Sequence, residues 1–413
     1  MSVRSRTSQT TADLLTAVPH DPRWQSPPWR SRVRKNLGKW FSENARTLPW
    51  RSDPTPYNVW VSEIMLQQTQ VATVLPYFER FLKQFPHIEK LANADDETLL
   101  AIWQGLGYYR RVRLMRDAAR HMTEHHRGQF PRRFEDILAL PGIGRYTAGA
   151  IASIALGQRR PIVEGNTVRV FARWTAMRTP PREKNAEKFL WHFSETMLPR
   201  SAPGDFNQAA MELGALICRV KPQCDICPVK NQCAARELGL VDEVPGKVST
   251  VQYESRREYA FVIESPRRPR DSALCRAEEG TTTQDAVYLL HRRPDRGRWA
   301  GLWDWPRPIE FVYGSPEAAL ESVTDALGVS CKLGVRLATL NHGVTKYRIT
   351  LDVHRATLGQ APSTPPNHHP RLPDGWRWAT LHEMRSIPMP VTANQIAERL
   401  TKSSQTELPL FSD

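Results

Sequence analysis

The hydrophobic pattern of this chain changes near residue 244. From Trp29 to about Leu240 the apolar residues recur at helical spacing, as in Val71, Val74 and Phe78. Beyond Val244 the chain turns to short β-rich runs such as EYAFVIE, AVYLLHR and YRITLDV, separated by Pro and Gly clusters. This change predicts an all-helical domain followed by an α+β domain, and 413 residues are enough for each to bury its own core.

The boundaries follow from composition. We place the helical domain at residues 28–244 and the α+β domain at residues 259–400, joined by a polar linker over residues 245–258. Residues 1–27 are rich in Ser, Thr, Arg and Pro and lack periodicity, so we predict a disordered basic extension. Residues 401–413 are expected to form a flexible tail.

The charge balance favours a polyanionic partner. The formal net charge is +14, and binding to phosphates is driven by release of their counterions. No apolar run reaches the roughly 18 residues of a spanning helix, and the first residues lack the apolar segment of a secretory signal. We therefore expect a cytoplasmic, nucleoid-associated bacterial protein that binds nucleic acid rather than a membrane, and nothing in the chain predicts an oligomer.

Four of the six cysteines fall within sixteen residues. Cys218, Cys224, Cys227 and Cys233 have the spacing C-x5-C-x2-C-x5-C. In a reducing compartment such clustering indicates a metal centre rather than disulfides. Four thiolates suit either zinc or an iron–sulfur cube, and the spacing alone does not choose between them.

A second motif lies at residues 140–148, LPGIGRYTA. It reads as a helix end, a glycine turn and a new helix starting near Arg145, which is a helix-hairpin-helix. Gly142 and Gly144 would allow close approach of a DNA strand, with the free N–H groups of the second helix directed at a phosphate. An ordinary helix–helix turn is the alternative.

The segment WVSEIMLQQTQ, residues 60–70, places one carboxylate and three amides on an otherwise apolar helix. Amides can fill the space left by an extruded base. A carboxylate in a dry pocket has a raised pKa and can hold a proton for a leaving group, which makes Glu63 the candidate acid. A buried carboxylate that only caps local backbone is the alternative.

Together these segments resemble a known family. LPWR at 48–51, SEIMLQQTQ at 62–70, GLGYYRR at 105–111, LPGIGRYTAGAI at 140–151 and FNQAAMELGA at 206–215 strongly resemble the MutY adenine DNA glycosylases. These belong to the helix-hairpin-helix superfamily that also contains endonuclease III. The resemblance runs over about residues 30–240 and continues more weakly beyond. It implies a base-excision repair enzyme that flips out adenine mispaired with 8-oxoguanine or guanine in double-stranded DNA and removes it.

The resemblance also assigns catalytic roles. Glu63 is similar to the family's general acid, which protonates the leaving adenine. The family's second carboxylate is an Asp in Asp-Gly-Asn, and here Glu164 takes its place before Gly165 and Asn166. Asn166 is expected to position that carboxylate or a water. Tyr146 stands where bifunctional relatives place a lysine that forms a Schiff base, so we predict a monofunctional enzyme that leaves an abasic site.

Binding roles follow by the same resemblance. Arg51 and Gln208, together with Glu63, are the expected contacts to adenine, and Gln68 and Tyr109 resemble the family's wedge into the duplex. The family's cysteine loop holds a [4Fe–4S] cluster, so we expect that cofactor on Cys218, Cys224, Cys227 and Cys233, although the family usually has six residues between the first two cysteines and this chain has five.

The second domain resembles the Nudix-like domain that the family uses to sense 8-oxoguanine. RPDRGRWAGLWDWP, residues 293–306, carries the resemblance, while residues 314–329 lack the paired glutamates of a Nudix hydrolase. We therefore do not expect hydrolysis of nucleoside diphosphates. Where the family reads the lesion with Phe-Ser-His, this chain has Val344-Thr345-Lys346, which leaves Thr345 and Lys346 as the expected DNA contacts.

The tail holds a last motif. Glu407-Leu408-Pro409-Leu410-Phe411 has the apolar spacing of a peptide that docks into a bacterial sliding clamp, with a frayed end as the alternative.

Two alternatives to the glycosylase remain. One methylene moves the Glu164 carboxylate by roughly 1 Å, a displacement that can cost about 100-fold in rate. The chain would then be a catalytically weak sensor that binds mismatches. An endonuclease III-like lyase is the other alternative, and both Tyr146 and the second domain argue against it.

Overall fold

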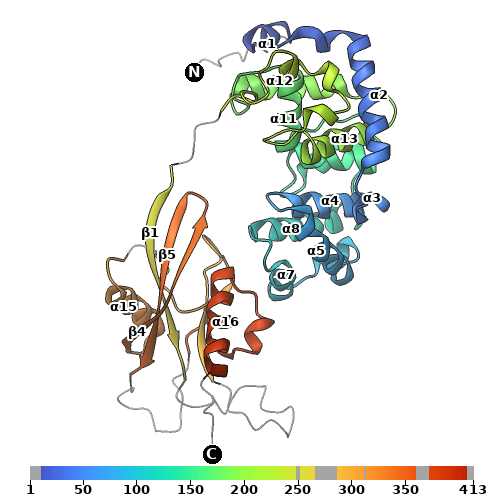
Figure 1. The fold of residues 1–413 in the computed structure, drawn as a ribbon. Helices are drawn as coiled ribbons and strands as arrows, with labels where there is room; N and C mark the ends of the chain where they lie inside the picture. The colour runs from blue at the N-terminus through green and yellow to red at the C-terminus, as the bar shows by residue number, and fades with distance from the viewer. Residues whose placement is uncertain (1–10, 248–251, 266–285, 311–312, 360–371, 407–413) are drawn as a thin grey trace, which may run out of the picture. The chain divides into compact units, whose positions relative to one another are not determined.

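The protein is described from a computed structural model, in which residues 11–247, 252–265, 286–310, 313–359 and 372–406 are described (Figure 1). The first part of the chain is helical, as predicted. Its helices are α1 (Thr11–Ala17), α2 (Pro27–Asn44), α3 (Pro49–Ser52), α4 (Pro56–Leu66), α5 (Val71–Gln84), α6 (Ile88–Ala92), α7 (Asp96–Trp103), α8 (Arg110–His126), α9 (Phe134–Ala139), α10 (Arg145–Ala150), α11 (Gly165–Trp174), α12 (Lys184–Met197), α13 (Pro203–Leu216) and α14 (Ala234–Glu237). One turn of π-helix, Ile151–Ala155, continues α10.

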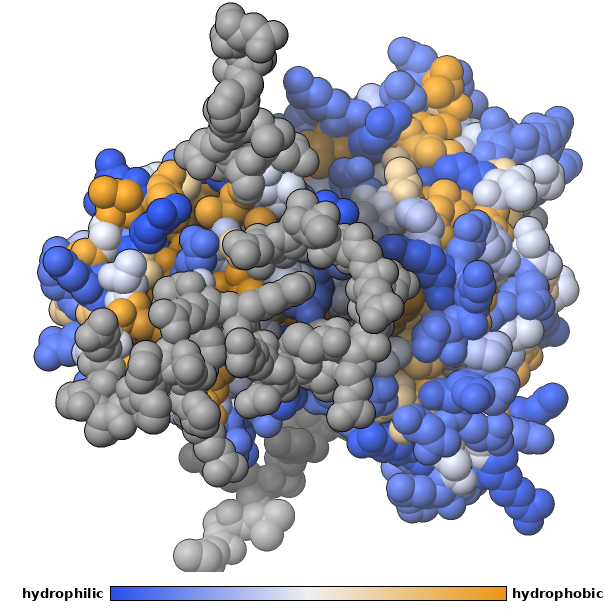
Figure 2. All heavy atoms as spheres, turned by 90° about the horizontal axis from the view of Figure 1, so that it is seen from below, coloured by the Kyte–Doolittle hydropathy of each residue, from blue (hydrophilic) through white to orange (hydrophobic). Residues whose placement is uncertain are grey.

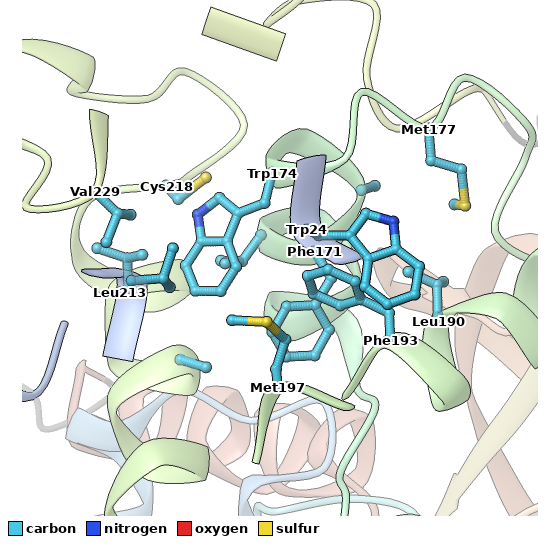
Figure 3. Packing of buried hydrophobic residues seen from close by; sticks show 14 of the residues in the cluster. Trp24, Phe171, Trp174, Met177, Leu190, Phe193, Met197, Leu213, Cys218 and Val229 are labelled. Atoms are coloured by element: carbon cyan, nitrogen blue, oxygen red, sulfur yellow. The ribbon is translucent and has the colours of Figure 1, made fainter. Parts of the chain in front are cut away.

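Aromatic side chains fill the core that α2, α11, α12 and α13 share. Phe171 and Phe193 are buried together, and Trp174 lies between these two rings and Cys218 (Figure 3). The apolar residues of α11 and α12 lie on one face of each helix, which is why these helices pack here. The cysteine loop therefore begins at the edge of the main core.

The N-terminal extension is not disordered over its described part. The 3₁₀ turn Pro22–Gln25 is capped by Asp21, and Trp24 is 2 % exposed with its ring centroid 5.3 Å from that of Phe193. Val18 is also fully buried. The prediction was wrong here because the apolar surface that covers Trp24 comes from α12, far along the chain, and leaves no trace in local composition.

The second part of the chain is an α+β domain. Its elements are β1 (Glu254–Ile263), β2 (Val287–Arg292), β3 (Trp303–Asp304), α15 (Pro316–Leu327), β4 (Cys331–Val344), β5 (Tyr347–Leu358), β6 (Trp376–Thr380) and α16 (Val391–Thr406). One sheet has the order β1-β5-β4, with β1 parallel and β4 antiparallel to β5, and the other has the antiparallel order β3-β2-β6. Figure 1 shows β1 and β5 side by side.

The core of this domain lies against α16. Trp305 is fully buried and its indole N–H donates to the carbonyl oxygen of Ala393 at 2.9 Å. Leu351 and Val353 of β5 and Ile396 of α16 complete the cluster. α15 begins with the Ser315 cap and ends where Gly328 takes a positive φ of 71°.

The predicted linker is shorter than expected. β1 begins at Glu254, whose register partner is Tyr347, so the last five residues of the 245–258 segment belong to the sheet. Pairing with β5 decides this, since ladder hydrogen bonds hold the strand although its sequence is polar. The predicted tail is likewise helical through Thr406, and residues 407–413 lie outside the described ranges.

Figure 2 shows hydrophilic and hydrophobic side chains interspersed over the coloured part of the face in view. Among the described residues, no helix combines the length and the apolar character that crossing a membrane requires.

Candidate active site and cysteine loop

Glu63 lies in the last turns of α4. The helix begins where the Thr55 hydroxyl accepts a hydrogen bond from the Asn58 N–H, and Pro56 occupies its first position. The Glu63 side chain is 5 % exposed, among Trp60, Ile64 and other apolar residues of this helix. Burial raises its pKa to about 7. The carboxyl can therefore hold a proton at neutral pH.

Tyr146, on α10, is the direct partner of Glu63. Its hydroxyl donates a hydrogen bond to Oε2 of Glu63, and this bond moderates the rise of the Glu63 pKa. Burial and the two nearby carboxylates raise the pKa of Tyr146 well above its usual value, so the phenol keeps its proton. The structure thus brings together two residues predicted from the sequence.

Glu164 caps the N-terminus of α11. Its two carboxylate oxygens accept the backbone N–H groups of Asn166 and Thr167, each at 2.8 Å, and the Thr167 hydroxyl accepts the N–H of Glu164 at 2.9 Å. Burial raises the pKa of Glu164, against the opposing effect of these two backbone bonds. The negative charge of Glu164 also raises the pKa of Glu63, so the two carboxylates belong to one electrostatic site.

The guanidinium of Arg51 forms an ion pair with the buried carboxylate of Glu212. The Arg51 guanidinium donates to Oε2 of Glu212 at 2.9 Å, and Arg46 binds the same carboxylate with two nitrogens, at 2.8 and 2.7 Å. Glu212 is 1 % exposed. Burial alone would raise the pKa of Glu212, but the two arginines lower it to about 2. Glu212 is therefore an anion throughout the physiological range.

Gln208 lies one turn before Glu212 on α13 and is half-buried. Residues four apart share a helix face, so both side chains can reach the same surface. Sequence analysis found Gln208 and missed Glu212 and Arg46. The signal was present, since Glu212 is a carboxylate inside the apolar segment FNQAAMELGA.

The predicted helix-hairpin-helix is formed by α9, a glycine turn and α10. Gly142 has a φ of 75°, and a Cβ there would lie 2.7 Å from Cβ of Leu114, so both conformation and space require glycine. Gly144 is the N-cap of α10 and has nothing within 4 Å of its Cβ position. The turn therefore leaves an open backbone surface.

The predicted wedge residues differ in exposure. Gln68 is exposed and has a φ of 61°, a left-handed backbone conformation that residues other than glycine rarely adopt. Tyr109 is only 8 % exposed, whereas Tyr108 is 53 % exposed with a φ of 48°. Assigning Tyr109 to a duplex-facing role was wrong, because its ring is used in packing; Tyr108 is the exposed tyrosine of the pair.

All four predicted cysteines line one small cavity, together with Arg173, Lys230 and Arg236. Burial raises the pKa of Cys227 to about 12 and that of Cys233 to about 11. Within the described ranges, no three His, Cys, Asp or Glu side chains converge as ligands of a single metal ion. Four sulfurs with three cations beside them fit an anionic iron–sulfur cluster in donor type and in charge. Cys218 lines the cavity despite the shorter spacing to Cys224.

Two arginines one turn apart on α11 bind this loop. Arg173 donates to Sγ of Cys218 at 3.4 Å and to the carbonyl oxygens of Arg219 and Val220 at 2.6 and 3.1 Å. Arg169 donates to the carbonyl oxygens of Cys218 and Gly214, both at 2.7 Å, and to Oδ1 of Asn166 at 3.0 Å. Arg169 thus joins the Glu164 cap to the cysteine loop. Sequence analysis missed both arginines, since the helical pattern does not reveal their backbone partners.

In the second domain, Thr345 and Lys346 form the turn between β4 and β5. Thr345 is exposed with a φ of 51°. Lys346 is exposed, but its ammonium pairs with Oε1 of Glu254 at 2.6 Å. A phosphate must therefore compete with Glu254 for this lysine.

Two segments of the chain match models of known protein families. Residues 61–195 match the family model described as HhH-GPD superfamily base excision DNA repair protein, and residues 281–399 match the NUDIX domain model. These matches confirm the two predicted kinds of domain, a helix-hairpin-helix glycosylase domain and a Nudix-like domain.

Curated relatives cover most of the chain. The adenine DNA glycosylase of mouse (Mus musculus) is 36% identical over 389 residues, which are 85% of this chain and 74% of the mouse protein. The human (Homo sapiens) adenine DNA glycosylase is 34% identical over 406 residues, 88% of this chain and 73% of that protein. Among solved structures, a thermostable thymine-DNA glycosylase is 26% identical with a TM-score of 0.46, covering 51% of this chain and 98% of that one. From the two domains and this identity over most of the chain, we conclude that the protein belongs to the adenine DNA glycosylases, the DNA N-glycosylases that act on adenine in base-excision repair.

Proposed function

We propose that this glycosylase removes adenine mispaired with 8-oxoguanine or guanine in double-stranded DNA and leaves an abasic site without cutting the strand. The observation that carries the proposal is the buried pair of Glu63 and Tyr146, in which a carboxyl with a pKa of about 7 lies beside a phenol that keeps its proton. Such a carboxyl can protonate a leaving base at neutral pH.

The proposed reaction uses the two carboxylates differently. Glu63 donates its proton to the adenine ring as the C1′–N9 bond breaks, and the bonding electrons leave with the base. The sugar becomes cationic at C1′, and the negative charge of Glu164 stabilises it until water adds and loses a proton. The two backbone N–H groups that hold Glu164 keep this charge in place and cost no reorganisation during the reaction.

Tyr146 supports the monofunctional mode. A strand-cutting lyase of this superfamily needs an amine that attacks C1′ and forms an imine. A phenol cannot form an imine, and here its oxygen is engaged with Glu63. The product expected is therefore an abasic site in an intact strand.

Recognition of adenine is assigned to Arg51 and Gln208 beside Glu63. Arg51 and Gln208 approach from α3 and α13, and Glu212 holds the guanidinium of Arg51 in place. A flipped base needs donors and acceptors for its Watson–Crick edge, which these side chains can supply. Asn166 is assigned to positioning, because its N–H holds Glu164 and its amide oxygen accepts from Arg169.

DNA binding is assigned to the hairpin and to Gln68 and Tyr108. The open backbone at Gly142 and Gly144 can approach a phosphate. Gln68 and Tyr108 are exposed on strained backbone, a state common at sites that insert into a ligand. Each of these side chains is of a kind that can enter the gap that a flipped nucleotide leaves.

The four cysteines are assigned to a [4Fe–4S] cluster, which would supply a fixed anchor for the loop that follows α13. Arg173, Lys230 and Arg236 would balance its charge. Two further roles are proposed for the C-terminal part: sensing of 8-oxoguanine by the Nudix-like domain, and clamp binding by residues 407–411, which lie outside the described residues. Deleting the last seven residues should abolish clamp binding, and unchanged binding would end that idea.

Single-turnover cleavage tests the function. Duplexes with adenine opposite 8-oxoguanine and opposite guanine are incubated with excess protein and analysed with and without alkali. Breaks that require alkali are expected. Tight binding with no abasic site would instead support the mismatch-sensor alternative, in which Glu164 does not sustain turnover.

A further inference from the structure

The end of the β1-β5-β4 sheet carries two tyrosine–arginine stacks. The guanidinium of Arg256 lies 3.6 Å from the ring centroid of Tyr347, and that of Arg348 lies 4.8 Å from the ring centroid of Tyr253. We call these four residues the tyrosine–arginine tip. Sequence analysis singled out none of them.

The two stacks lie on opposite faces of the sheet. Tyr347 pairs with Glu254 in the register of β1 and β5, and Arg348 pairs with Ser255. Successive residues of a strand point to opposite faces, so Tyr347 and Arg348 point apart. The arginines therefore cannot converge on one small anion, and each can meet a separate phosphate of a long polyanion.

Stacking leaves the edge of each guanidinium available. A tyrosine ring covers one flat face of the guanidinium and fixes its orientation, while the N–H groups remain at its rim. Tyr253 is 56 % exposed, Arg348 is exposed, and one third of the Arg256 side chain is exposed. A planar fork held in this way suits the bidentate geometry of a phosphate.

One acidic residue neutralises part of the tip. Glu254 pairs through Oε1 with Lys346 at 2.6 Å and through Oε2 with Arg256 at 3.2 Å. With Lys346, Arg256 and Arg348 against Glu254, the end of the sheet carries a net charge of +2. A DNA phosphate would replace Glu254 as the partner of Lys346 and Arg256.

We propose that the tyrosine–arginine tip binds two phosphates of duplex DNA, with Tyr253 and Tyr347 as positioning residues that hold the two guanidinium groups. The inference rests on the proposed function only in taking duplex DNA as the partner. The contacts are to the backbone, so they add affinity for any duplex and do not read the lesion.

Binding by the full-length protein tests the proposal. The dissociation constant is measured against salt concentration in a Glu63→Gln background, for a paired duplex and for duplexes with adenine opposite guanine or 8-oxoguanine. Arg256→Ala and Arg348→Ala should each weaken binding to all three duplexes by the same factor. Each should reduce the magnitude of the slope of the logarithm of the dissociation constant against the logarithm of the salt concentration by about 0.9, and the double variant by about twice that.

Matched variants separate contact from net charge. Arg355→Ala removes an exposed cation from the same strand, about 26 Å from Tyr347 at 3.3 Å per residue, and should leave the slope unchanged. Tyr347→Phe keeps the platform and should bind as the parent does, whereas Tyr347→Leu should weaken binding. Glu254→Gln should tighten binding to every duplex, while Glu321→Gln, an exposed acid on α15, should not.

Three results would overturn the proposal: no change in Arg256→Ala and Arg348→Ala, an equal loss in Arg355→Ala, or a loss confined to the 8-oxoguanine duplex. Thermal unfolding shows whether each variant is folded. If an alanine variant is unfolded, the comparison of Tyr347→Phe with Tyr347→Leu still tests the proposal. Failure of the proposed function is distinct, because it would appear as absent adenine release by the protein with Glu63 intact, at saturating concentration.

Discussion

The hydroxyl of Tyr146 donates a hydrogen bond to the carboxylate of Glu63, joining α10 to α4 across 83 positions of sequence. Burial raises the pKa of Glu63 to about 7, and the same burial keeps Tyr146 protonated. The charge of Glu164 adds to the rise and that of Arg51 opposes it. The acid strength of Glu63 is therefore set first by its burial and then by three side chains from three other segments.

The cleavage rate should depend on pH through Glu63. The pKa of Glu63 is raised in the folded protein, so its proton is present below about pH 7 and is lost as pH rises through that value. Single-turnover rates should fall about tenfold for each pH unit above the pKa, because only the protonated carboxyl acts as the acid. A rate that stays flat from pH 6 to 9 would contradict this role.

Tyr146→Phe should move that pH profile. The hydrogen bond from Tyr146 lowers the pKa of Glu63, so its removal should raise the pKa and shift the alkaline limb to higher pH. Tyr57→Phe is the matched control, since it removes a half-buried hydroxyl from the same helix α4, one that donates to the carbonyl oxygen of Phe85. The idea fails if both variants have the profile of the parent.

Changes at Glu164 should separate its two roles. Glu164→Gln keeps a side-chain oxygen as a cap and removes the charge, so we expect a large loss of cleavage rate with little loss of stability. Glu164→Ala should also lower the free energy of unfolding by about 1 kcal/mol, because the cap is lost. Denaturant unfolding and single-turnover cleavage measure the two effects, and equal rates for Glu164→Gln and the parent would argue against an electrostatic role.

Glu164→Asp tests whether the site is built for the longer side chain. The carboxylate of the shorter side chain could not keep the present 2.8 Å hydrogen bonds from Asn166 and Thr167. A loss of rate would mean that the site has adapted to Glu, and a large gain would mean that Glu slows the reaction.

Arg169→Ala should disturb the cap of α11 and the cysteine loop together. Its loss leaves the carbonyl oxygens of Cys218 and Gly214 without this donor, which should lower the free energy of unfolding by about 2 kcal/mol. We also expect a lower iron content in the purified protein. Arg178→Ala, which removes an exposed ion pair with Glu243, is the control. Normal iron content and normal cleavage in Arg169→Ala would contradict the link.

The order of the two domains, the hairpin, the clustering of the four cysteines and the buried carboxyl of Glu63 followed from the sequence. Each depends on local pattern: helical or alternating periodicity, a glycine turn, ligand spacing, or one carboxylate in an apolar helix. These features depend on residues that lie close together in the sequence. The resemblance to the family's motifs predicted the partners of Glu63, which local patterns cannot supply.

Only the tertiary structure decided the rest. Composition predicted disorder around Trp24, but packing on α12 orders it, and Tyr108 rather than Tyr109 is exposed because only one of two adjacent rings can face the core. Glu212 is an anion because Arg46 and Arg51 reach it from about 160 positions away. The pKa of a buried group and the availability of a surface cation depend on which distant residues fold against them, and that information is not local in the chain.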